Sequence, residues 1–284
     1  MKLISFLDHL AATPTTGTAP RRALLQQVGR AAVAALPLSL GAALPTVADT
    51  KDSSFDVILQ LLLLERLQVA FYAQGLAAAG LIPAAQTADF QRLLAHQTQH
   101  LTFFGQVLQN AGAISPVAPT FDFSGRHGVA SNPELFPAVL TSYDAYLALA
   151  QQLEDLGVRL YKAAAFKITS DASVSRAVLR IHAVEAQHSA HVRGLRRSRG
   201  AVVKNWPSEE DAPIDRPGAA QALTIAATGG EETAIQYVAT NVAVPFADLL
   251  LIRDGNAIHD PALPEAFDEL VTTAVAQAAL NLFI

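Results

Sequence analysis

The chain has 284 residues, of which 51% are hydrophobic and only 16% are charged, and it contains no cysteine. The absence of cysteine excludes disulfide scaffolds, thiol catalysis, iron–sulfur clusters and cysteine zinc sites, so any metal ion would need His and carboxylate ligands. The 20 Lys and Arg against 25 Asp and Glu give a net charge of -5, which argues against nucleic acid as a partner.

Residues 1–48 have the composition of an export signal. Arg21 and Arg22 precede a short apolar run at residues 31–44, and small residues follow up to about Ala48. This order of basic, apolar and small-residue regions is typical of export signals, and the arginine pair resembles a twin-arginine signal. We therefore expect an exported protein of the periplasm or cell envelope. The alternative is an amphipathic helix that stays with the fold.

From Asp52 onward, apolar residues recur at spacings of three and four, which predicts helices. The expected long helices cover residues 54–80, 84–112, 133 or 137 to 167, and 171 or 173 to 199. A connection rich in Pro and Gly, residues 113–132, follows the second helix and is long enough to cross the end of a bundle. The sequence therefore predicts an all-α fold, a four-helix bundle with a long crossover between its second and third helices, over residues 49–204.

Two stretches without Asp, Glu, Lys or Arg, residues 67–88 and 93–121, raise the question of a membrane protein. Each contains Gln together with Gly and Pro, whereas a membrane-spanning helix needs about 20 predominantly apolar residues. We expect both stretches to belong to uncharged bundle helices, and the mature chain to have no membrane span.

Residues 205–284 form a predicted C-terminal helical extension that packs on the bundle and carries no recognisable site motif. Helices are expected near residues 219–229, 231–253 and 263–284, the middle one kinked by Pro245. The apolar last segment and the charge-poor first two bundle helices favour a homodimer or a paralogous partner protein. The positive charges of an arginine cluster at the end of the fourth bundle helix would interact favourably with the helix dipole, so we expect no anionic partner for them. The cluster comprises Arg193, Arg196, Arg197 and Arg199.

Polar residues interrupt the apolar stripe of each predicted bundle helix. In chain order they are Glu65, Gln97, His100, Glu154, Glu185 and His188. A buried carboxylate costs several kcal/mol unless it is paired or bound to a cation. Interruptions at matching heights on four helices therefore favour one shared cation site.

The spacing of these residues indicates that one helical hairpin has been used twice. Residues three apart share a helix face, so the pairs on the second and fourth helices can each bind one ion together. Glu65 and Gln97 are 32 positions apart, and Glu154 and Glu185 are 31 apart. One Glu from each of two helices, with Glu-x-x-His from each of the other two, is the arrangement of dimetal carboxylate bundles.

These segments make the chain similar to the ferritin-like family, and within it to the exported bacterial branch related to plant desiccation-related proteins. The matching segments are Leu64–Tyr72, His96–His100, Leu153–Val158 with Tyr161, and Ile181–His188. The resemblance implies a ferritin-like bundle in which some of the stripe residues bind metal. The implied ligands are Glu65, His100, Glu154, Glu185 and His188.

Gln97 departs from the pattern, because the resemblance places a bridging Glu at this position. A neutral amide offers one oxygen but cannot bridge two divalent ions as a carboxylate does. We therefore expect one ion at Glu154, Glu185 and His188 and a weakened second position at the two remaining ligands, giving one or two ions per chain. The ligand types suit Fe or Mn, and Zn also fits.

The same residues could instead form a metal-free polar network. In that alternative Glu185 accepts a hydrogen bond from His100, and Glu154 pairs with an arginine such as Arg180. Paired buried carboxylates do occur without metal ions.

Several neighbours of the stripe residues have more modest expected roles. For Tyr72 and Tyr161 the main expectation is packing in the core, and the alternative is a role in hydrogen bonding or redox chemistry. His96, His182 and His191 are expected to support ligands or to lie at the surface.

Two functions fit this pattern. The first is a metal-dependent, di-iron-like oxidoreductase or an iron- or manganese-handling protein that protects against oxidative stress. The second is a non-catalytic structural or stress-protective protein with an inactive metal site. Glu154 with the intact Glu185–His188 pair favours the first, whereas Gln97 and Gln68 favour the second.

Overall fold

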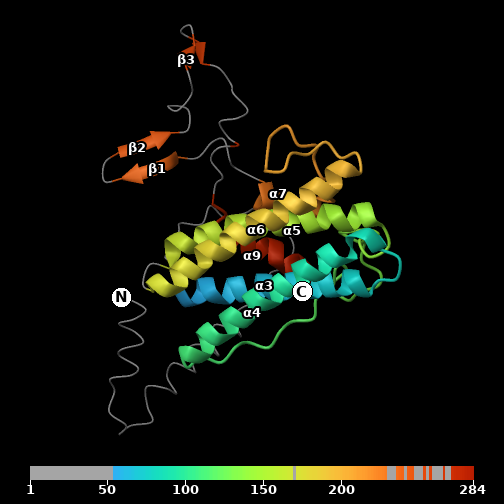
Figure 1. The fold of residues 1–284 in the computed structure, drawn as a ribbon, viewed down its shortest axis with the longest axis horizontal. Helices are drawn as coiled ribbons and strands as arrows, with labels where there is room; N and C mark the ends of the chain where they lie inside the picture. The colour runs from blue at the N-terminus through green and yellow to red at the C-terminus, as the bar shows by residue number, and fades with distance from the viewer. Residues whose placement is uncertain are drawn as a thin grey trace.

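Four long helices form the larger part of the computed structural model (Figure 1). The structure describes residues 54–168, 171–228, 235–239, 242–245, 252–253, 256–257, 265 and 270–284. The predicted export segment, residues 1–48, lies outside this part of the chain. Among the described helices, none combines the length and the apolar composition that a membrane crossing requires.

The bundle consists of two helical hairpins, as the apolar spacing predicts. Helix α3 covers Ser54–Ala77 and, after the short 3-10 helix η1 at Ala84–Gln86, α4 covers Thr87–Asn110. Helices α5 at Tyr143–Lys167 and α6 at Ala172–Ser198 form the second hairpin. The four-helix bundle with a long crossover between its second and third helices is confirmed.

The crossover is longer than predicted, because the third helix begins at Tyr143 and not at Pro133 or Pro137. Ala138 has a positive φ of 55°, which a right-handed α-helix does not allow, so no helix can run from Pro133 or Pro137 through this residue. Ser142 then caps α5 by accepting a hydrogen bond from the backbone N–H of Ala145.

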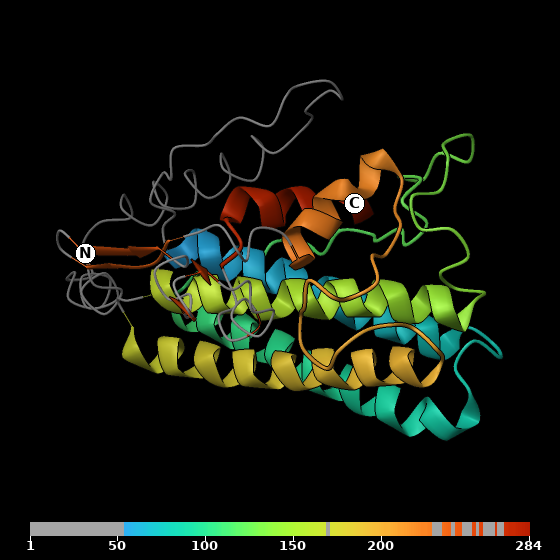
Figure 2. The same ribbon diagram turned by 90° about the horizontal axis from the view of Figure 1, so that it is seen from above.

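Helices α7 and α9 cover the outer side of the bundle along α3 and α5 (Figure 2). Helix α7 covers Gln221–Thr228, and α9 covers Thr273–Leu280, followed by the 3-10 helix η4 at Asn281–Phe283. Arg159 of α5 donates to the backbone oxygens of Ile225 and Ala226. This cover buries α5 on nearly all sides. It confirms the predicted C-terminal helices near 219–229 and at the chain end, although α9 begins only at Thr273 and not near Leu263.

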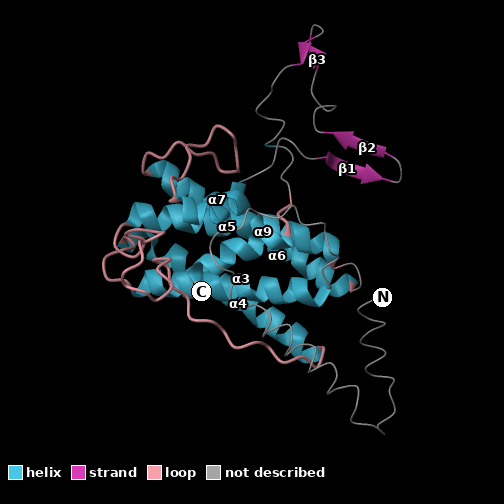
Figure 3. Cartoon of the chain, turned by 180° about the vertical axis from the view of Figure 1, so that it is seen from behind, coloured by secondary structure: helices cyan, strands magenta, loops and turns pink. Residues whose placement is uncertain are grey.

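The predicted middle helix of the extension, residues 231–253, is wrong where the structure describes it. Strand β1, Ile235–Ala239, pairs antiparallel with β2, Val242–Pro245, and the short strands β3 and β4 pair at Ile252–Arg253 and Asn256–Ala257 (Figure 3). The segment is rich in Thr, Ile, Val and Tyr, which favour strands over helices.

Arg193 corrects the expectation that the arginine cluster needs no anionic partner. Its side chain is fully buried, and its Nε and Nη2 donate to the two carboxylate oxygens of Asp155 at 3.0 and 2.6 Å. Its Nη1 donates to Asp211 at 2.5 Å and to the backbone oxygen of Trp206 at 3.1 Å. One side chain therefore joins α6 to α5 and to the loop that follows α6. Arg199 also has a partner, Asp144.

Replacing Arg193 tests whether these bonds stabilise the fold. Arg193→Met leaves Asp155 buried without its charge partner, so we expect the free energy of unfolding to fall by about 3–5 kcal/mol in urea denaturation. Arg197→Met, at an exposed position of the same helix, is the matched control and should change it by less than about 0.5 kcal/mol. Equal stability of the two variants would contradict a structural role for the buried ion pair.

Candidate metal centre

The six polar residues that interrupt the predicted apolar stripes come together in the middle of the bundle. All six are buried, and the three carboxylates and the Gln97 amide are fully inaccessible to solvent. They form two groups that share Glu185, within each of which the candidate ligand atoms lie within 4.8 Å of one another. The first group is Glu65, His100 and Glu185, and the second is Glu154, Glu185 and His188.

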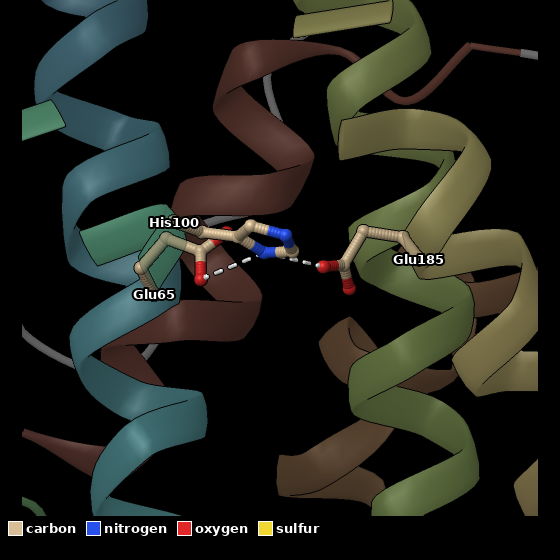
Figure 4. Close-up of side chains that lie close together, drawn as sticks. All are labelled: Glu65, His100 and Glu185. Atoms are coloured by element: carbon tan, nitrogen blue, oxygen red, sulfur yellow. Dashed lines mark ion pairs between the residues drawn. The ribbon is translucent and has the colours of Figure 1, made fainter. Parts of the chain in front are cut away.

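In the first group an imidazole lies between two carboxylates (Figure 4). His100 Nδ1 is 3.1 Å from Glu185 Oε1 and 3.6 Å from Glu65 Oε2. Burial alone would lower the pKa of His100, but its hydrogen bonds to Glu185 and Glu65 outweigh burial and raise the pKa to about 10. Burial also raises the pKa of Glu65 to about 7. A proton on His100 Nδ1 and the NH2 group of Gln97 are therefore alternative donors to this group, because the two nitrogens are 2.9 Å apart when the NH2 faces the carboxylates.

The amide of Gln97 lies between the same two carboxylates. Amide orientation is assigned from the surrounding hydrogen bonds. Its neighbours are satisfied when the nitrogen faces Glu65 Oε2 at 3.2 Å and Glu185 Oε1 at 3.1 Å, and the oxygen accepts from Gln68 Nε2 at 3.3 Å. An amide nitrogen has two N–H groups, one for each carboxylate. The NH2 group thus stands where a cation bridging Glu65 and Glu185 would be.

The second group has no such internal partner. His188 Nδ1 lies 3.5 Å from Glu154 Oε2 and 3.8 Å from Glu185 Oε1. Within the described part of the chain, His188 Nδ1 and Glu154 Oε2 are both buried without a hydrogen-bond partner. Burial lowers the pKa of His188, which keeps its imidazole neutral, and raises that of Glu154 to about 7. A divalent cation binds neutral imidazole and carboxylate, so an ion bound here would displace any proton on Glu154.

Two buried tyrosines each donate a hydrogen bond to a glutamate of the other hairpin, Glu154 or Glu65. Tyr72 of α3 donates to Glu154 Oε1, and Tyr161 of α5 donates to Glu65 Oε1. Burial raises the pKa of both phenols well above the usual value, so both remain protonated donors. Hydrogen bonding, the second of the two roles expected for these tyrosines, is therefore present beside packing. Tyr72 fixes one oxygen of Glu154 and leaves Oε2 directed at His188.

The metal-free alternative is present in one half of the cluster only. The contact between His100 and Glu185 forms as that alternative expects. Arg180 is exposed, whereas Glu154 is fully buried and contacts Tyr72 and His188.

The remaining histidines lie outside the two groups. His96 Nδ1 is 2.9 Å from His188 Nε2. His182 Nδ1 is 3.0 Å from the backbone oxygen of Val158, and His191 pairs with Asp89 at 3.6 Å.

Gly157 is the residue of the site that sequence reasoning missed. A Cβ added there would lie 2.9 Å from Glu185 Oε2 and 3.4 Å from Gln68 Nε2. The signal was present in the sequence, because Gly157 follows Glu154 by three positions and so shares its helix face. Its missing side chain lets α5 approach the central carboxylate.

Comparison with known proteins agrees with this geometry. The family model described as the ferritin-like domain matches residues 53–198, a range that contains the five residues of the two groups and Gln97. No curated protein matches the chain.

Gly157→Ala tests the close approach of α5 to Glu185. We expect the metal-free variant to lose about 1–3 kcal/mol of unfolding free energy in urea denaturation, because Glu185 must move to admit the methyl group. Gly105→Ala is the matched control, since an added Cβ there meets nothing within 4 Å, and Ala favours helices over Gly by up to about 1 kcal/mol. A Gly157→Ala variant as stable as Gly105→Ala would disprove the contact.

Proposed function

Because the chain belongs to the ferritin-like domain family, we propose that its bundle binds one divalent metal ion between Glu154, Glu185 and His188. One observation carries the proposal. His188 Nδ1 and Glu154 Oε2 face each other at 3.5 Å, both buried and without a hydrogen-bond partner among the described residues. Two buried acceptors in this position repel each other unless a cation or a proton lies between them, and a divalent ion would satisfy both at once.

The proposal assigns one ion per chain and not two, because the first group is already satisfied. The Gln97 amide donates to Glu65 and Glu185 in the place of a second cation. A second ion would have to displace this amide.

The ligand set of two carboxylates and one imidazole suits Fe or Mn, and Zn also fits. Fe or Mn in this position would supply one-electron redox chemistry toward oxygen or peroxide. The two carboxylates would balance the charge of a divalent ion, and Tyr72 would hold Glu154 in its ligating orientation. We therefore propose that the protein handles iron or manganese, or protects against oxidative stress.

The place of action and the oligomeric state belong to the same proposal. Residues 1–48 have the order of a twin-arginine export signal, which supports export to the periplasm or cell envelope. Exposed apolar side chains such as Phe166 and Leu179, 67% and 51% accessible, support a homodimer or a paralogous partner.

A second candidate function follows from the first group. Glu65, His100 and Gln97 satisfy one another without a metal ion, as expected of a structural or stress-protective bundle that no longer needs metal. In this alternative the second group would also stay without a metal ion.

Metal content separates the two functions. After refolding with Fe, Mn or Zn and desalting, elemental analysis should find about one ion per chain with at least one of these metals. Glu154→Gln should lose the ion, whereas Glu65→Gln should keep it, because only Glu154 belongs to the proposed ligand set. The two residues are matched, since both are fully buried and hydrogen-bonded to a tyrosine. Less than about 0.1 ion per wild-type chain with every metal would favour the structural function.

Gln97→Glu tests why only one ion is expected. The new carboxylate can bridge two cations and adds the missing negative charge, so we expect metal content to rise from about one to about two ions per chain. Gln97→Leu removes the amide without adding charge and should stay at about one ion. A Gln97→Glu protein that still binds one ion would show that the amide is not what blocks the second position.

A further inference from the structure

His96, on the outer side of α4, contacts a proposed ligand from behind. We propose that His96 is a positioning residue that fixes the tautomer of His188, so that the Nδ1 lone pair of His188 faces Glu154 and Glu185. This inference rests on the proposed function, because it assigns His96 to the same metal site.

The geometry of the two imidazoles is that of an edge-to-edge hydrogen bond. His96 Nδ1 and His188 Nε2 are 2.9 Å apart, and the ring planes differ by only 14°. The ring centroids are 5.2 Å apart, which exceeds the N···N distance by about two ring radii. The two nitrogens therefore lie along the line between the rings, as a straight N–H···N bond requires.

One ring must donate in this pair and the other must accept, because a neutral imidazole has one N–H and one lone pair. If His96 donated, the proton of His188 would sit on Nδ1. That proton would point at Glu154 Oε2 and Glu185 Oε1, which are 3.5 and 3.8 Å away. Neither distance makes a good hydrogen bond, so a buried donor would lose its partner.

The opposite direction satisfies every group once a cation is bound. His188 Nε2–H donates to His96 Nδ1, and the free lone pair of His188 Nδ1 is directed at the proposed ion. Histidine ligands generally donate their second N–H to a neighbouring acceptor, which fixes the ring and its tautomer. Here the acceptor is a neutral imidazole, so the divalent ion is balanced by Glu154 and Glu185 alone.

The exposure of the two rings assigns them different tasks. His188 is 4% exposed and belongs to the second candidate ligand group. His96 belongs to the exposed residues of α4 and lies outside both candidate ligand groups. His96 therefore acts on the ion only through His188.

Two substitutions separate the hydrogen bond from the shape of the ring. His96→Phe keeps a flat ring but has no acceptor, whereas His96→Asn places an amide oxygen near the position of Nδ1. His191→Phe is the control, since His191 lies three residues after His188 on α6 and pairs with Asp89.

The first readout is the hydrogen bond of the His188 Nε2–H, measured by ¹⁵N NMR of the imidazole nitrogens in the Zn(II)-saturated protein. We expect an Nε2–H that exchanges slowly with solvent in the wild type, in His96→Asn and in His191→Phe, and one that exchanges faster in His96→Phe. A wild-type Nε2–H that exchanges as fast as that of His96→Phe would overturn the proposal.

The second readout is Zn(II) affinity, measured by competition with a chromophoric chelator. We expect His96→Phe to bind Zn(II) about 10–100 times more weakly than the wild type, and His96→Asn to retain most of the affinity. Wild-type affinity in His96→Phe would overturn the proposal. If the wild type binds no Zn(II), the proposed function fails, whereas equal Zn(II) affinity of the wild type and His96→Phe removes only the positioning role of His96.

Discussion

The burial of three carboxylates in a core with few charges is the constraint on which the rest of the structure depends. Glu65, Glu154 and Glu185 are fully buried, and each costs several kcal/mol unless a donor or a cation compensates it. Two crossed tyrosines, one histidine and two glutamines provide donors. Glu154 Oε2 and His188 Nδ1 have no such donor among the described residues, and the proposed ion would bind both atoms.

The two halves of the bundle repeat a hairpin, and one side chain makes them unequal. The crossed bonds from Tyr72 to Glu154 and from Tyr161 to Glu65 follow the repeat. Gln97 breaks this repeat. A glutamate at this position would leave room for a cation, whereas the NH2 group of Gln97 fills that place and donates to Glu65 and Glu185. A site that would hold two ions with a Glu at this position becomes, on this account, a site for one.

The bundle and its site could be predicted because they depend on a periodic pattern. Apolar stripes at helical spacing located the four helices, and the polar interruptions of those stripes located the site. The strands after residue 234 were missed because Thr, Ile and Val fit a short helical pattern as well as a strand. The bonds of Arg193 were missed because Asp155 lies beside the stripe residue Glu154, on a different face of its helix, and because Asp211 lies in a loop, whose path the helical period does not fix. Gly157 was missed because it contributes no side chain to the site; its role is to leave room for the carboxylate of Glu185.

The central claim concerns where one ion binds, and anomalous X-ray diffraction from crystals of the Mn-loaded protein tests it most directly. The account predicts a single anomalous peak, coordinated by Glu154, Glu185 and His188 at distances typical of metal–ligand bonds, with the Gln97 amide still between Glu65 and Glu185. A peak between Glu65 and His100, or two peaks bridged by Glu185, would contradict it.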